Sequence, residues 1–191
     1  MITSILLTGV GGQGILLSAG IIASAAEFVG HDVKTNEIHG MAQRGGSVTA
    51  QVRFGDKVFS PLALEGTVDV LAAMEHVEAL RWAHFLKPDG LAAVARTTIV
   101  PVTATTGACR YPDDVEARLR AVFRNLRYED CGKLAQEEGS AKLANVVLTG
   151  ILSNALPDIP EEAWLAAVER RVKKEFVDAD VRAFRKGRNL T

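Results

Sequence analysis

A glycine-rich turn near the start of the chain restricts the folds that this sequence can adopt. The apolar run Ile5–Leu7 precedes it, the turn itself is GVGGQG at positions 9–14, and an apolar stretch without proline continues to Val29. The run predicts a strand that is buried on both faces. The longer stretch predicts a helix that is packed on nearly all sides, with Gly30 at its C-terminal cap.

Strand and helix patterns alternate along the rest of the chain. His31–Ile38 predicts a second strand, which would form a parallel pair with the first through a right-handed crossover. Ser47–Phe54 alternates with a period of two residues, and a turn at Gly55-Asp56 would lead it into a hairpin with Val58-Phe59. Further strands are expected at 68–73 and 91–95, and further helices at about 76–86, 113–125, 140–156 and 164–176.

This alternation predicts an α/β fold, namely a three-layer α/β/α sandwich with a mostly parallel, Rossmann-like sheet. We expect residues 1–191 to form a single domain, because no repeat, linker or low-complexity tract interrupts them. The C-terminal helices, at about 140–188, are expected to pack on this domain or on a partner protein.

Composition excludes several classes of function. The 22 basic and 23 acidic residues nearly cancel, whereas nucleic-acid-binding domains usually carry a basic surplus. The two cysteines, Cys109 and Cys131, cannot provide a disulfide scaffold, a CxxC pair or the four thiolates of an iron–sulfur cluster. We expect no leader peptide, and no apolar stretch of about 20 residues is present in the sequence. We therefore expect a cytoplasmic protein that binds neither nucleic acid nor a membrane.

The turn at 9–14 fits the G-x-G-x-x-G pattern, directly after a predicted strand and at the start of a predicted helix. Glycines in this position allow an anion to approach the backbone N–H groups at the positive end of a helix. A dinucleotide site would also need an acid about 20 residues further on, and Glu37 lies where such an acid is expected. The glycines could equally serve only to bring the strand and the helix close together.

A second segment, EIHGMAQRGGSV at 37–48, follows the second predicted strand. Ligand-binding loops of α/β sheets occur at this end of a strand. Arg44 beside Gly45-Gly46 could present a guanidinium and bare backbone amides to a phosphate or carboxylate. Taken singly, Arg44 could instead form a surface ion pair, the two glycines a bend, and His39 a structural hydrogen bond.

Together the two segments resemble the gamma-type subunits of the 2-oxoacid:ferredoxin oxidoreductases. GVGGQG at 9–14 and an Arg-Gly-Gly loop about thirty residues later are the joint signature of that family. The form of the segment at 37–48 is most similar to the small (beta) subunit of indolepyruvate:ferredoxin oxidoreductase. The resemblance extends over most of the chain, including 68–75 and 184–187.

The resemblance implies an α/β/α domain that packs against a larger subunit, which holds thiamine diphosphate and iron–sulfur clusters. Such a complex decarboxylates a 2-oxoacid, passes electrons to ferredoxin and delivers the acyl group to coenzyme A. This chain would bind no cofactor alone and would contain no catalytic or metal-binding residue. The residues that could face thiamine diphosphate or coenzyme A are Gly11, Gly12, Gln13, Gly14, Arg44, Gly45 and Gly46.

Two other functions are compatible with the sequence. One is a free-standing NAD(P)-binding oxidoreductase, although no substrate domain accompanies the glycine turn. The other is a purely structural interaction subunit. Tight nucleotide binding by the chain alone would favour the first, and loop substitutions without effect on turnover would favour the second.

Overall fold

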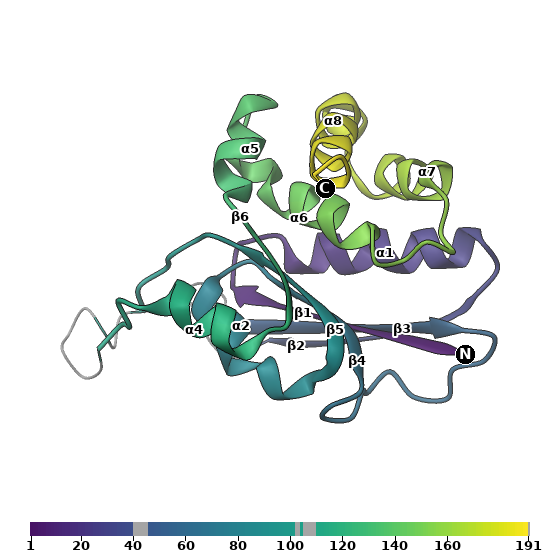
Figure 1. The fold of residues 1–191 in the computed structure, drawn as a ribbon. Helices are drawn as coiled ribbons and strands as arrows, with labels where there is room; N and C mark the ends of the chain where they lie inside the picture. Colours follow the sequence, from purple (N-terminus) through teal and green to yellow (C-terminus); the bar gives the residue numbers. More distant parts are fainter. Residues whose placement is uncertain (40–45, 102–103, 105–109, 191) are drawn as a thin grey trace.

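The computed structural model describes residues 1–39, 46–101, 104 and 110–190. Six strands form one sheet in the order β2-β3-β1-β4-β5-β6 (Figure 1). Their bounds are β1 Ile2–Val10, β2 Asp32–His39, β3 Ser47–Gly55, β4 Val68–Ala73, β5 Leu86–Ala95 and β6 Asn125–Glu129. The pairs β1–β4, β4–β5 and β5–β6 are parallel, which confirms the mostly parallel α/β sheet.

The predicted parallel pairing of the first two strands is wrong. β3 lies between β1 and β2 and pairs with both in the antiparallel direction over their whole length. The predicted hairpin with Val58-Phe59 is also wrong, since no strand is formed there and Phe59 is 83% exposed. The longer β3 gains two full ladders of backbone hydrogen bonds in the sheet interior, which a hairpin with two residues could not supply.

Helices cover both faces of the sheet (Figure 1). On one face lie α1 Ile15–Phe28, α5 Cys131–Glu137, α6 Ala144–Ser153, α7 Glu161–Arg171 and α8 Val177–Arg188. On the other lie α2 His76–Arg81 and α4 Val115–Val122. Short 3₁₀ turns occur at η1 Ala83–Phe85, η2 Ala141–Leu143 and η3 Lys174–Phe176. The three-layer sandwich is therefore confirmed.

Alternating residues of β1 supply the two cores. Ile5 and Leu7 face the α1 layer, whereas Leu6 faces the layer of α2 and α4. Helix α1 lies between the sheet and α7, as its apolar composition predicts (Figure 1). It ends where Gly30 takes a φ of 87°, a left-handed conformation that glycine adopts without strain.

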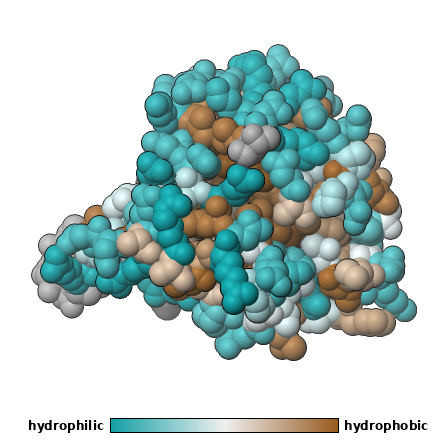
Figure 2. Space-filling view, in the orientation of Figure 1, coloured by the Kyte–Doolittle hydropathy of each residue, from teal (hydrophilic) through white to brown (hydrophobic). Residues whose placement is uncertain are grey.

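The C-terminal helices pack within the same core as the sheet. Trp164 of α7 and Phe184 of α8 are fully buried, and their rings stack with centroids 5.7 Å apart. Helices α6 and α8 approach so closely that a Cβ atom on Gly187 would lie 1.9 Å from the carbonyl oxygen of Val147. The outer side of this layer is largely hydrophilic on the face shown in Figure 2. Its apolar side is thus covered by the chain itself.

Several predicted helix bounds differ from the structure. The expected helix at 113–125 ends at Val122, because the chain turns into the short strand β6. The expected helix at 140–156 begins with a 3₁₀ turn that Ser140 caps, and the expected helix at 164–176 is replaced by parts of α7 and η3. The helix from 76 ends at Arg81, since β5 already begins at Leu86. Neither β6 nor α5 was predicted.

Candidate functional site

The sheet contains a crevice at the carboxyl ends of β1 and β4. Helix α1 leaves β1 toward one face of the sheet, and α2 leaves β4 toward the opposite face. Open α/β sheets bind their ligands at such a switch point. The glycine turn and the described end of the second segment lie at this edge, because the start of β3 at Ser47 pairs with the end of β1 at Val10.

The structure brings the two predicted segments together. The backbone N–H of Gly11 donates to the carbonyl oxygen of Gly46 at 2.9 Å. Gly12 is exposed with a φ of 101°, and Gly14 has a φ of 77°. A Cβ atom on Gly14 would also lie 2.7 Å from Nδ2 of Asn145, whose amide donates to the Gly14 carbonyl at 3.3 Å. Glycine at 14 is required both by the backbone and by this close approach.

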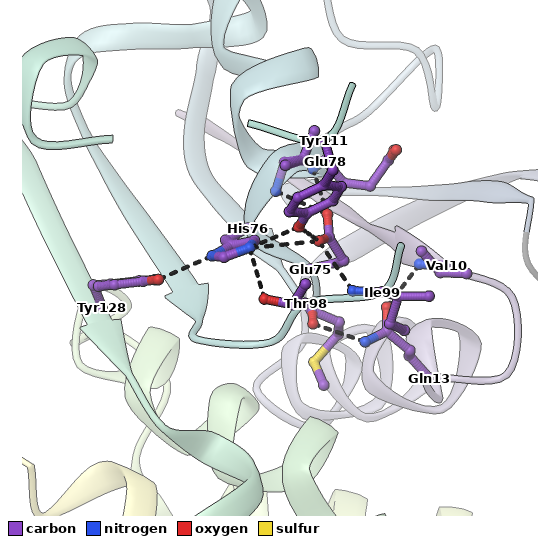
Figure 3. Close-up of polar contacts among 11 residues, drawn as sticks. Val10, Gln13, Glu75, His76, Glu78, Thr98, Ile99, Tyr111 and Tyr128 are labelled. Atoms are coloured by element: carbon purple, nitrogen blue, oxygen red, sulfur yellow. Dashed lines mark hydrogen bonds and ion pairs between the residues drawn. The ribbon is translucent and has the colours of Figure 1, made fainter. Parts of the chain in front are cut away.

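Gln13 is held at both ends of its amide group (Figure 3). Its Oε1 accepts from the N–H of Val10 at 2.7 Å, and its Nε2 donates to the carbonyl oxygen of Met74 at 2.8 Å. The side chain therefore ties the glycine turn to the end of β4. Among the described residues, no side-chain hydrogen bond caps the start of α1, and its first turn contains no acidic residue. The positive end of this helix therefore has no charged neighbour from its own helix.

Other residues of the second segment are placed less directly. Arg44 and Gly45 lie outside the described residues, as does the side chain of His39. Glu37 lies in β2, which β3 separates from β1. Since neighbouring strands lie about 4.8 Å apart, this acid is about two strand spacings from the glycine turn. The ribose-binding position of a dinucleotide site requires the strand next to β1.

A cleft of about 390 Å³ adjoins both segments. Sequence patterns did not predict it, because its polar side chains come from three separate parts of the chain. It is lined by Val10, Ser47, Glu75, Val77, Glu78, Arg81, Ile99, Pro101, Ala104, Arg110, Tyr111 and Pro112. The glycine segments reach this cleft at their edges, through Val10 and Ser47.

Glu75 is a buried carboxyl group that lines the cleft, and Figure 3 shows its polar contacts. Its Oε2 accepts from the N–H groups of Val77 at 2.8 Å and Glu78 at 2.9 Å, so the carboxylate caps the start of α2. Its Oε1 accepts from the hydroxyl of Tyr111 at 2.5 Å and the N–H of Ile99 at 3.4 Å. Four donors match the acceptor capacity of a carboxylate.

His76 continues this network into the protein. Because the Tyr111 hydroxyl donates to Glu75, its oxygen accepts from Nε2–H of His76 at 2.7 Å, and the Tyr128 hydroxyl donates to Nδ1 at 2.9 Å. Burial lowers the pKa of His76, and the Glu75 carboxylate opposes this effect. Burial, together with the hydrogen bond to Glu75, raises the pKa of Tyr111 well above its usual range. The histidine is thus a neutral member of the network.

Glu78 links the second segment to α2. Its side chain is 8% exposed, and its Oε2 accepts from the hydroxyl of Ser47 at 2.5 Å. Its Oε1 accepts from Nε of Arg81 at 3.0 Å, whereas the Arg81 side chain is 60% exposed. One acid therefore connects the residue that follows Gly46 to a guanidinium at the cleft.

Comparison with known proteins identifies the family. Residues 4–190 match the family model described as pyruvate ferredoxin/flavodoxin oxidoreductase. The chain belongs to this family. It is similar to the indolepyruvate oxidoreductase subunit IorB of Archaeoglobus fulgidus, with 40% identity over 190 residues that cover 97% of this chain and 94% of the relative. The resemblance carried by the two glycine segments is thereby confirmed, as is the assignment to an oxidoreductase subunit.

Solved structures share the fold. The gamma subunit of a keto/oxoacid ferredoxin oxidoreductase from Geobacter sulfurreducens aligns with a TM-score of 0.72 at 24% identity, covering 97% of this chain and 95% of that one. A 2-oxoglutarate:ferredoxin oxidoreductase from Magnetococcus marinus, solved with 2-oxoglutarate, coenzyme A and succinyl-CoA bound, aligns with a TM-score of 0.73 at 22% identity. In that case 99% of this chain matches 31% of a longer polypeptide. The fold therefore occurs both as a separate chain and as part of a larger one.

The residues of this chain do not fit an iron–sulfur cluster. Cys131 is buried, and its burial, with a smaller contribution from the negative charge of Glu129, raises the pKa of its thiol to about 12. Cys109 lies outside the described residues. Two cysteines fall short of the usual four thiolates. In the described ranges, no group of three His, Cys, Asp or Glu side chains could hold a metal ion. No helix there has the length and apolar character to cross a membrane.

Proposed function

We propose that this chain is the small subunit of an indolepyruvate:ferredoxin oxidoreductase, or of an enzyme for a related 2-oxoacid, and that residues 1–191 act in it as one domain. The observation that carries the proposal is the hydrogen bond between Gly11 and Gly46, which joins the two signature segments at one edge of the sheet. The 40% identity to a subunit named for indolepyruvate favours that substrate among the 2-oxoacids.

A larger partner subunit would hold thiamine diphosphate and the iron–sulfur clusters that pass electrons to ferredoxin, since this chain lacks the thiolates for them. In that complex, this chain would form part of the wall of the active-site region and would bind phosphate groups of thiamine diphosphate or of coenzyme A. The exposed Gly12 and the uncapped start of α1 support this role. The residues assigned to it are Gly11, Gly12, Gln13, Gly14, Arg44, Gly45 and Gly46.

The arrangement of the sheet argues against a free-standing dinucleotide enzyme. Because β3 lies between β1 and β2, Glu37 is not on the strand beside the glycine turn. The side-chain amide of Gln13 forms its hydrogen bonds with the backbone of Val10 and Met74. We therefore expect weak or absent binding of NAD(P) by the chain alone. A purely structural role would leave the exposed Gly12 and the uncapped helix start without a function.

The proposal is tested with the chain co-expressed with a larger subunit of the same enzyme family. We expect reduction of ferredoxin that depends on both a 2-oxoacid and coenzyme A, with indolepyruvate used better than 2-oxoglutarate or pyruvate. Calorimetry on the isolated chain provides the opposing test. Dinucleotide binding with micromolar affinity, about −8 kcal/mol, and no 2-oxoacid oxidation by the complex would contradict the proposal.

A further inference from the structure

We propose that Arg81 is an anion-binding residue of the cleft, and that the second glycine segment positions it through Ser47 and Glu78. The inference rests on the proposed function, because it assigns a ligand-binding residue to the same site. It adds a side chain from α2 to a site that the glycine segments alone would define.

A continuous series of contacts leads from the glycine turn to Arg81. Gly11 donates to Gly46, and the next residue, Ser47, donates its hydroxyl proton to Oε2 of Glu78 at 2.5 Å. Oε1 of the same carboxyl group accepts from Nε–H of Arg81 at 3.0 Å. The position of the guanidinium is thus determined by a segment that lies more than thirty residues earlier in the chain.

The guanidinium keeps its outer edge available. Within the part of the chain that the structure describes, the contacts of Arg81 are made by Nε, and no hydrogen bond occupies its two terminal amino groups. These two groups form the planar fork that binds a phosphate or a carboxylate through two parallel hydrogen bonds. Arg81 lines the cleft together with Tyr111 and the mostly exposed Arg110.

The two acids of the cleft direct their oxygen atoms to donors of the protein itself. Glu75 is matched by four hydrogen-bond donors, including two backbone N–H groups of α2. Glu78 is matched by Ser47 and by Arg81 itself. Both carboxylates are therefore engaged within the protein, whereas the free edge of Arg81 is a charged donor at the cleft without a hydrogen-bond partner among the described residues.

An ordinary surface ion pair looks different in the same protein. Arg120 pairs with Glu116 on α4, and both side chains are about half exposed, at 62% and 47%. The acid that holds Arg81 is instead 8% exposed and is oriented by a residue from another element. Burying a carboxylate to orient an exposed guanidinium has a desolvation cost, which a surface pair avoids. This difference favours a binding role for Arg81.

The ligand group is an oxyanion that accepts two parallel hydrogen bonds. In the proposed reaction it is either a phosphate of coenzyme A or the carboxylate of the 2-oxoacid. The assembled complex distinguishes the two sources, since the Michaelis constant is measured separately for each substrate. Inorganic pyrophosphate, titrated by calorimetry into the complex loaded with thiamine diphosphate, probes phosphate binding without turnover.

The test compares Arg81→Gln with the matched control Arg120→Gln. We expect Arg81→Gln to raise KM for coenzyme A, or for the 2-oxoacid, about tenfold or more, the loss typical of one charge-assisted pair. If the ligand is a phosphate, pyrophosphate binding weakens to the same degree. Arg81→Lys should recover part of the loss, and Arg120→Gln should leave both constants unchanged. The melting temperature of each complex reports whether folding is intact.

The positioning step is tested with Ser47→Ala and with the double variant Ser47→Ala/Arg81→Gln. If Ser47 acts through Arg81, the single variant raises the same KM and the two effects are not additive. Arg81→Gln indistinguishable from Arg120→Gln in an active complex would overturn the inference and leave the proposed function intact. A wild-type complex without 2-oxoacid oxidation would count against the proposed function, while pyrophosphate binding would still decide whether Arg81 binds a phosphate.

Discussion

Replacing Tyr111 by phenylalanine removes a hydroxyl group that contacts both Glu75 and His76. The buried carboxylate loses one of its four donors, and Nε2–H of His76 retains only the hydroxyl of Thr98, at 3.1 Å, as an acceptor. A hydrogen bond to a charged group contributes about 1.5–3 kcal/mol. Because Tyr111 is only partly buried, water can replace some of this contact, and we expect a loss of about 1.5–2 kcal/mol.

Urea denaturation of the wild-type and Tyr111→Phe proteins measures this loss directly. In thermal denaturation, each kcal/mol corresponds to about 2–4 °C in the melting temperature of a chain of this length. We therefore expect the melting temperature of Tyr111→Phe to be about 3–8 °C lower than that of the wild type. Tyr128→Phe serves as the control, because it removes a neutral hydrogen bond to His76 and should cost about 1 kcal/mol. A loss below about 0.5 kcal/mol for Tyr111→Phe would refute the reasoning. So would a loss for Tyr128→Phe that exceeds the loss for Tyr111→Phe, because the hydrogen bond to the charged Glu75 should contribute more than the one to the neutral His76.

Three further predictions concern pH, packing and turnover. Burial lowers the pKa of His76 below that of the unfolded chain, so the unfolded state binds the proton first and stability should decline as pH falls below about 6.5. His76→Gln should flatten this part of the profile, and an unchanged slope would contradict the assignment. Gly187→Ala should lower the free energy of unfolding by more than about 2 kcal/mol through overpacking. Gly132→Ala should leave this free energy nearly unchanged in chemical denaturation, because a Cβ atom at 132 would lie 3.6 Å from its nearest neighbour. Arg44→Ala should lower turnover of the complex roughly 10- to 100-fold with the fold intact, and wild-type kinetics and assembly would show an ordinary surface residue.

Local patterns predicted the first part of the fold well. The apolar run before the glycine turn is β1, the apolar stretch after it is α1, and Gly30 ends that helix. These elements depend on neighbouring residues, whose periodicity and backbone preferences the sequence contains. The place of β3 between β1 and β2 depends on pairing between distant segments, which periodicity does not report.

The candidate site, like the fold, could be predicted only in part from the sequence. The two glycine segments were found because their spacing and residue types are distinctive, and the structure joins them through Gly11 and Gly46. The network of Glu75, His76 and Tyr111 was missed, since its acid and its tyrosine are 36 residues apart and neither belongs to a motif. Only the fold brings such side chains together.

Omission of this subunit provides the most direct test of the central claim. The larger partner subunit is purified with and without this chain, and reduction of ferredoxin by indolepyruvate and coenzyme A is followed. We predict that neither subunit is active alone and that mixing them restores turnover in proportion to the amount of complex formed. Full activity of the larger subunit without this chain would contradict the claim that the chain completes the enzyme.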